Sequence, residues 1–109
     1  MITEKLQFKQ DKHYPHEALG QKPKYGARLG DDKLMLSVVY GGGSYGSGPV
    51  SDQYEIALFD EDDMVQLNEY DTVQGWVPAE TINHIVSVLE DNNISNKVAR
   101  IQRILKRHD

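Results

Sequence analysis

Two runs of alternating apolar and polar residues, separated by a glycine-rich stretch, constrain the fold of this chain most strongly. The first run, residues 33–40, has an apolar side chain at every second position: Leu34, Leu36, Val38 and Tyr40. The second run, residues 53–59, repeats the pattern with Tyr54, Ile56 and Leu58. A period of two is typical of a strand with one buried face. The nine residues 41–49 between the runs include five glycines, which favours a loop. The two strands are therefore predicted to pair as an antiparallel hairpin with a long tip.

Shorter runs of the same kind flank this hairpin. Residues 24–29 alternate in the same way and are followed by the turn-forming sequence Gly-Asp-Asp at 30–32. Residues 60–63 are acidic and predict another turn, after which residues 64–68 alternate again. Strands joined in sequence by turns form a meander. We therefore expect an antiparallel β-meander of about four strands, at 24–29, 33–40, 53–59 and 64–68.

The last third of the chain has the period of amphipathic helices. Ile82, Ile85, Val86 and Leu89 form one apolar stripe, and Ile94, Val98, Ile101 and Leu105 form another. Pro78 suits the first turn of a helix, and Asn92 and Asn93 suit its end. The sequence predicts a C-terminal helical hairpin at 78–91 and 95–107, packed on the inner face of the sheet. The expected fold class is α+β.

The length of 109 residues suits one domain with its own core. Prolines interrupt residues 1–23, so we expect an irregular N-terminal arm, followed by a single α+β domain at 24–109. The chain has no cysteine, which excludes disulfides and thiolate metal sites. No apolar run is long enough to cross a bilayer, and charges interrupt the N-terminal residues. We expect no membrane contact and a cytoplasmic location.

Charge is strongly segregated along the chain. The net charge is −5, yet residues 34–96 contain no Lys or Arg and eleven Asp or Glu. Residues 97–109 contain five Lys or Arg and one Asp. Such a distribution predicts either an acidic surface for a basic partner, an internal match with the basic ends, or a solvated acidic face that serves solubility.

Four stretches resemble a family of small proteins encoded by tailed bacteriophages: Leu36–Tyr40, Gly43–Gly46, Tyr54–Leu58 and Val73–Ile82. The resemblance covers about residues 33–90 and implies a phage or prophage origin, hence the cytoplasm of a host cell. It implies no particular activity. In that context an acidic domain without a catalytic constellation is predicted to bind a host protein, for example as an inhibitor or anti-defence factor.

The residues expected to contact such a partner lie at the loop tip, in the acidic segments and at the single tryptophan: Tyr45, Asp52, Asp60, Glu61, Asp62, Asp63 and Trp76. Aromatic side chains flanked by small residues suit a binding loop. The alternative interpretations are a simple acidic turn and a tryptophan that anchors the start of a helix in the core. In the acidic turn Met64 and Val65 occupy the positions where a calcium loop has a ligand and its glycine, so no metal is expected there.

Two further function classes remain open. The basic residues of the last helix, Lys97, Arg100, Arg103, Lys106 and Arg107, suit nucleic-acid phosphates, or simply a solvated helix face. The loop Gly41–Pro49 contains the spacing G-x-G-x-x-G and could hold a phosphate or nucleotide. The dinucleotide motif needs a helix after the glycines, whereas Pro49 and a strand follow here.

No residues pair a nucleophile with a base, so we expect no enzyme activity, no catalytic residues and no cofactor. His13 and His16 have a spacing seen in zinc sites, but Pro15 lies between them and no second ligand pair is near in sequence, so no metal site is expected. His84 lies off the apolar stripe of its helix and is predicted to be half exposed. The basic last helix and the acidic middle of the chain also suit a two-fold homodimer, with a monomer of dipolar surface as the alternative.

Overall fold

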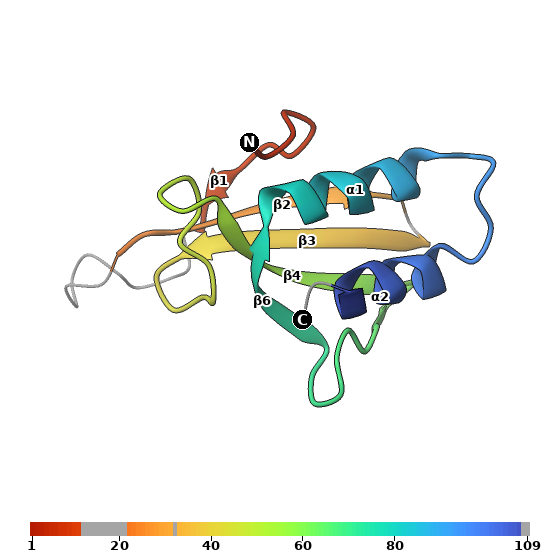
Figure 1. Cartoon of the computed structure of the whole chain (residues 1–109). Coiled ribbons are helices and arrows are strands. Elements are labelled where there is room, and N and C mark those ends of the chain that lie inside the picture. Colours follow the sequence, from red (N-terminus) through yellow and green to blue (C-terminus); the bar gives the residue numbers. More distant parts are fainter. Residues whose placement is uncertain (12–21, 32, 108–109) are drawn as a thin grey trace.

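The computed structural model describes residues 1–11, 22–31 and 33–107, and this part of the chain forms six strands and two helices. The strands are β1 Lys9–Gln10, β2 Lys24–Gly30, β3 Leu34–Gly41, β4 Gln53–Asp60, β5 Asp63–Met64 and β6 Val73–Pro78. The helices are α1 Ala79–Glu90 and α2 Lys97–Arg107. The predicted α+β class, the antiparallel sheet and the two C-terminal helices are confirmed (Figure 1).

All strands belong to one antiparallel sheet with the order β1-β2-β3-β4-β5. β4 is its central element, because β3 pairs along one edge and both β5 and β6 pair along the other. β5 pairs with the end of β4 at Phe59 and Asp60, whereas β6 pairs with residues 53–57. Compared with the predicted four-stranded meander, the sheet has one additional strand at each side, namely β1 beside β2 and β6 beside β4.

The alternation in β3 and β4 produces one sheet face whose centre is fully buried. The register pairs Leu36 with Leu58 and Val38 with Ile56, and none of these side chains is more than 1% exposed. Both helices lie against this face (Figure 1). Each helix contributes three or more buried side chains: Ala79, Thr81, Ile82, Ile85, Val86 and Val88 from α1, and Ile101, Ile104 and Leu105 from α2. No helix in the described ranges is long and apolar enough to span a membrane.

Two parts of the sheet differ from the sequence prediction. The strand expected at 64–68 ends after Met64, because Leu67 is buried in the core and Asn68 begins a turn. The Asn68 side-chain oxygen accepts hydrogen bonds from the amides of Tyr70 and Asp71, which closes this turn. β6 was not predicted. Pro78 is its last residue and precedes α1, so the helix begins one residue later than expected.

The ends of the helices also differ slightly from expectation. α1 ends at Glu90 and is followed by Asp91 in an extended conformation, so neither Asn92 nor Asn93 provides the predicted left-handed cap. The left-handed residue is Asn96, with φ 55°, directly before α2. The second helix therefore begins at Lys97 rather than at residue 95.

Part of the expected N-terminal arm packs on the domain. β1 pairs with β2, with Lys9 opposite Gly26, and Leu6 is only 4% exposed within the core. Thr3 donates its amide to the Asn83 side chain of α1 at 2.8 Å. Residues 12–21 of the arm, including His13 and His16, lie outside the described residues.

An unsatisfied hydroxyl gives a stability prediction. Thr81 is 2% exposed, and its hydroxyl oxygen has no hydrogen-bond partner among the described residues. Leaving a buried polar group unpaired costs about 1–3 kcal/mol. We expect Thr81→Val, which keeps the shape and removes the hydroxyl, to raise the free energy of unfolding by about 1 kcal/mol in urea denaturation. Thr81→Ser, which keeps the hydroxyl and removes the methyl, should lower it. A valine variant less stable than wild type would contradict this account.

A second prediction concerns the aromatic end of the core. The rings of Phe8, Tyr40 and Tyr54 contact one another, with centroid separations of 5.1–5.7 Å. The pKa of Tyr54 is raised from 10.0 to about 12, mainly by burial. The negative charge of Asp52 and the hydrogen bond between Tyr54 and Asp52 are smaller causes. Burial also raises the pKa of Tyr40. Between pH 10 and about 12 the tyrosines of the unfolded chain lose their protons, whereas Tyr54 in the folded protein keeps its proton. The free energy of unfolding should therefore fall as the pH rises from 10 toward 12.

The measurement is urea denaturation at neutral pH and at small steps above pH 10. Tyr54→Phe removes one ionising group, so its stability should decline less steeply over this window, with Tyr40 still contributing. Equal slopes for wild type and the phenylalanine variant would contradict the assignment to Tyr54.

Candidate functional site

The β4–β6 pairing contains an irregularity that exposes the only tryptophan. Tyr54 pairs with Val77 and Ile56 pairs with Gln74, so Glu55 faces two residues of β6 rather than one. This is a β-bulge, a feature that redirects side chains and is enriched near functional sites. Trp76 occupies the bulge with φ 54°, a left-handed conformation that is unfavourable for a bulky residue. The neighbouring Val77 is 3% exposed, whereas Trp76 is 54% exposed.

Tyr45 of the glycine loop lies directly against this bulge. The Trp76 amide donates to the Tyr45 carbonyl at 2.7 Å, and the Tyr45 amide donates to the Glu55 carboxylate at 3.1 Å. A Cβ on Gly75 would lie 2.4 Å from the Tyr45 Cβ, so only glycine permits this approach. Tyr45 is 62% exposed. We call Tyr45 and Trp76 the aromatic patch.

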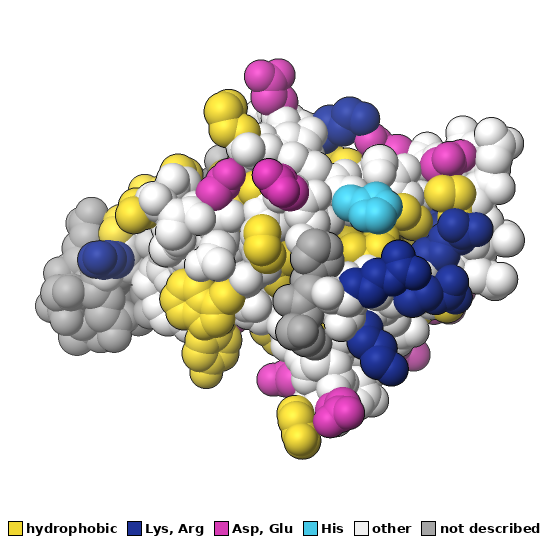
Figure 2. All heavy atoms as spheres, viewed as in Figure 1, with side chains coloured by type: hydrophobic (Ala, Val, Ile, Leu, Met, Phe, Trp, Pro, Cys, Tyr) yellow, Lys and Arg dark blue, Asp and Glu magenta, His cyan; other side chains and the backbone are white. Residues whose placement is uncertain are grey.

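Acidic side chains border the aromatic patch. Asp52 precedes the residue of β4 that pairs with Pro78, and its carbonyl accepts the Ala79 amide at 2.9 Å. This bond holds Asp52 beside the first turn of α1, where Glu80 is exposed. Glu55 lies within the bulge itself. Figure 2 shows hydrophobic side chains grouped where β6 meets the glycine loop, with acidic side chains close to the start of α1.

The four acidic residues 60–63 lie elsewhere. They form the turn from β4 to β5 and are all exposed. Asp52 and Asp60 are at opposite ends of the eight-residue strand β4, about 25 Å apart at the rise of an extended chain. From the residues selected by sequence, the structure therefore brings Tyr45 and Trp76 together and places Asp52 beside the start of α1, directly after β6. It places residues 60–63 at the other end of the sheet.

Asp52 also has partners within the domain. Its carboxylate accepts a hydrogen bond from the Tyr54 hydroxyl at 3.3 Å and lies 3.2 Å from the amino group of Met1. The residue has φ 56°. These contacts fix Asp52 beside the start of α1 and leave it partly exposed.

The glycine loop offers few free amides for a phosphate. Five of its amides already donate within the protein, namely those of Gly41, Gly42, Ser44, Tyr45 and Gly48. A hollow of about 530 Å³ borders the loop and is lined by Lys22, Val50 and loop residues. A loop that holds phosphate does so through unpaired backbone amides. Phosphate binding at this loop stays a prediction that the observed hydrogen bonds do not favour.

The basic residues of α2 separate into three groups. The Lys97 ammonium donates to the Leu89 carbonyl at the end of α1, so this lysine links the two helices. Lys106 lies beside the turn around Asn68, in a depression that includes Gln66 and Tyr70. Arg100, Arg103 and Arg107 instead border a groove shared with His84 of α1. His84 is exposed rather than half exposed.

Three contributors to these surfaces were not selected from the sequence as binding residues. Glu55 contacts the aromatic patch because the β4–β6 register places it opposite the bulge, and Glu80 lies in the first turn of the helix that follows β6. A sequence pattern carries no signal for that register. His84 lies beside the arginines of α2 because of how the two helices pack, and the sequence alone does not show this packing. Within residues 1–11, 22–31 and 33–107, no group of three or more His, Asp or Glu side chains could hold a metal ion.

Comparison with known proteins gives no relative from which a function could be transferred. No protein-family model, no curated protein and no solved structure matches the chain. Functional conclusions therefore depend on the surfaces themselves.

The close approach at Gly75 predicts how the aromatic patch responds to a methyl group. Gly75→Ala would place a Cβ 2.4 Å from Tyr45 and displace the loop from the bulge. We expect a loss of about 1–3 kcal/mol in the free energy of unfolding and a shifted fluorescence spectrum of Trp76. Gly42→Ala is the control, because Gly42 has neither a left-handed φ nor a crowded Cβ position. An unchanged spectrum for Gly75→Ala would contradict the contact.

Proposed function

We propose that this chain is a non-enzymatic protein-binding domain whose contact surface is the aromatic patch. The observation that carries this proposal is the exposed Trp76 at a strained bulge, hydrogen-bonded through its backbone to the exposed Tyr45. Tyrosine and tryptophan are enriched among the residues that dominate binding energy at protein interfaces. Left-handed conformations of bulky residues persist where the surrounding structure holds them and cluster at functional sites.

The aromatic patch is already ordered for binding. Two backbone-amide hydrogen bonds fix Tyr45 relative to the bulge, at 2.7 Å and 3.1 Å. Gly75, which has no side chain, lets Tyr45 pack directly against the backbone of β6. Because less conformational freedom remains to be lost on association, a preformed surface binds more tightly than a mobile one of the same composition.

The acidic residues near the aromatic patch favour a partner with a basic contact surface. Asp52, Glu55 and Glu80 are acidic, and no Lys or Arg occurs between residues 34 and 96. A partner with Lys or Arg around an apolar pocket would match this surface, since complementary charge raises the association rate and excludes acidic competitors. Arginine could also stack on the exposed rings. The sequence resemblance implies a phage origin, and the proposed partner of a phage protein of this kind is a host protein.

The experiment is affinity capture from bacterial lysate at low salt with quantitative mass spectrometry. The test variant is Tyr45→Ser/Trp76→Ser, and the matched control is Tyr70→Ser, which alters an aromatic residue 92% exposed at a distant turn. We expect a protein retained by wild type and by the control, reduced at least about tenfold with the double variant, and weakened by added salt.

Purified partner and wild-type chain should then bind directly, with the same order of affinities among the variants. Retention of the same proteins by wild type and the double variant would contradict the aromatic patch as the binding surface. Capture of acidic rather than basic partners would contradict the role of the acidic border.

A further inference from the structure

A second surface, separate from the aromatic patch, lies between the two helices. It is a groove of about 220 Å³ with Val88 and Ile104 at its apolar base. His84 of α1 borders one side, and Arg100, Arg103 and Arg107 of α2 border the other. Figure 2 shows the histidine beside a group of basic side chains over α2. We call these four residues the basic groove.

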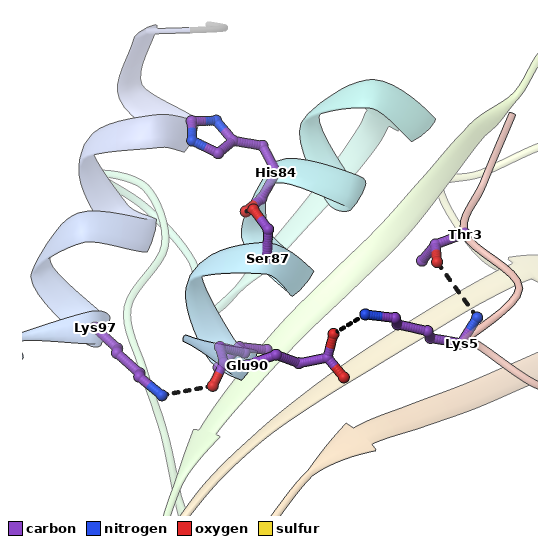
Figure 3. A network of polar contacts seen from close by, with 7 residues as sticks. Thr3, Lys5, His84, Ser87, Glu90 and Lys97 are labelled. Carbon is purple, nitrogen blue, oxygen red and sulfur yellow. Dashed lines mark hydrogen bonds and ion pairs between the residues drawn. The ribbon is translucent and has the colours of Figure 1, made fainter. Parts of the chain in front are cut away.

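The helical period explains why the three arginines gather. Positions 100, 103 and 107 are separated by three and four residues, so they lie on one stripe of α2. The stripe adjoins Ile104, whose burial against α1 brings the arginines to the helix–helix boundary. Figure 3 shows the His84 ring directed from α1 toward α2.

Polar contacts at the C-terminal end of α1 tie this helix to α2 and to the N-terminal residues. The Lys97 ammonium in the first turn of α2 donates to the carbonyl of Leu89, and Lys5 forms an ion pair with Glu90 (Figure 3). The Ser87 hydroxyl donates to the His84 carbonyl at 2.7 Å. The geometry of the basic groove is therefore set before any ligand binds.

The positive charge of the basic groove is not neutralised by the described part of the chain. Ion pairs there join Lys5 to Glu90 and the Met1 amino group to Asp52, and none involves an arginine of α2. Among the residues that the structure describes, no acidic side chain lines the basic groove. Three guanidinium groups on one stripe repel one another, and an anion placed among them would relieve that repulsion.

We propose that the basic groove binds the phosphate backbone of a nucleic acid. Arginine is well suited to phosphate, because its planar guanidinium donates two parallel hydrogen bonds. From Arg100 to Arg107 the helix advances about 10 Å, a length that spans several phosphates of a duplex carrying one charge per about 1.7 Å. The three arginines are all exposed along one stripe of the helix, which suits an extended polyanion better than a single enclosed phosphate.

Binding of this kind is independent of sequence and of the protein-binding surface. No aromatic residue of the described ranges lines the basic groove, so these residues offer bases no stacking surface and contacts to the backbone dominate. The proposal does not require the aromatic patch and can succeed or fail alone.

The test is fluorescence anisotropy with a fluorescein-labelled DNA duplex of random sequence, titrated with the full chain at several salt concentrations. Three phosphate contacts predict a slope of log affinity against log salt of about −3. Arg103→Ala should weaken binding and reduce this slope by about one, and Arg100→Ala/Arg103→Ala by about two. His84→Ala should weaken binding without abolishing it.

Lys106→Ala is the matched control, since it removes the same charge from another face of the same helix. It should leave the slope unchanged. The altered side chains are all exposed, and circular dichroism checks that the fold is intact. An identical salt slope for Arg103→Ala and Lys106→Ala would overturn the assignment to the basic groove.

Two other results would also overturn the proposal. One is binding of inorganic triphosphate but not of the duplex, which would assign the basic groove to a small anion. The other is a low-salt dimer in sedimentation that the arginine substitutions abolish, with no duplex binding. The basic groove would then hold carboxylates of a second copy of this chain, such as those of residues 60–63.

Discussion

The pairing of β4 along both of its edges is the constraint on which the rest of this molecule depends. Its buried face supplies Tyr54, Ile56 and Leu58, each no more than 1% exposed, and these side chains form much of the surface that the helices cover. One edge fixes β3, and the other holds β6, which leads into α1 without an intervening loop. A shift of one residue in either register would turn the apolar side chains of a strand to the opposite face. The core, the start of α1 and the bulge at Trp76 are thus set by the same strand.

The sequence predicted the elements in which local pattern and burial agree. β2, β3 and β4 alternate regularly between an apolar and a mixed face, and their bounds agree with prediction to within one residue. The helices were equally clear, because apolar residues at three- and four-residue spacing face one sheet. In these segments no tertiary contact competes with the local preference.

β6 and β5 show where local pattern fails. In β6, Gly75 and Pro78 disfavour a strand, and the bulge at Trp76 interrupts the alternation that would have identified it. In residues 64–68 the alternation is present, yet the chain leaves the sheet because Asn68 satisfies the amides of the following turn. The pairing of β6 with β4 and the burial of Leu67 depend on contacts between segments, which periodicity does not record, and the turn at Asn68 depends on side-chain hydrogen bonds that periodicity does not record either.

The same distinction applies to the candidate surfaces. Composition identified Tyr45 and Trp76 as unusual, but their contact follows from the β4–β6 register and from the absence of a side chain at Gly75. A helical wheel places Arg100, Arg103 and Arg107 on one stripe, whereas only the packed structure adds His84 and assigns Lys97 to the end of α1. The sequence shows which residue types are present, but only the fold shows which of them lie close together.

The segregation of charge along the chain becomes a separation of surfaces in space. Acidic side chains border the aromatic patch, and basic ones gather over α2 on the same viewed face (Figure 2). Because the helices use their apolar stripes against the sheet, the arginines of α2 are exposed along the boundary with α1. Internal neutralisation is therefore limited, and the two described ion pairs leave the α2 arginines available. A surface that attracts cations and one that attracts anions can each act here because the rigid helix–sheet packing keeps them from pairing with one another.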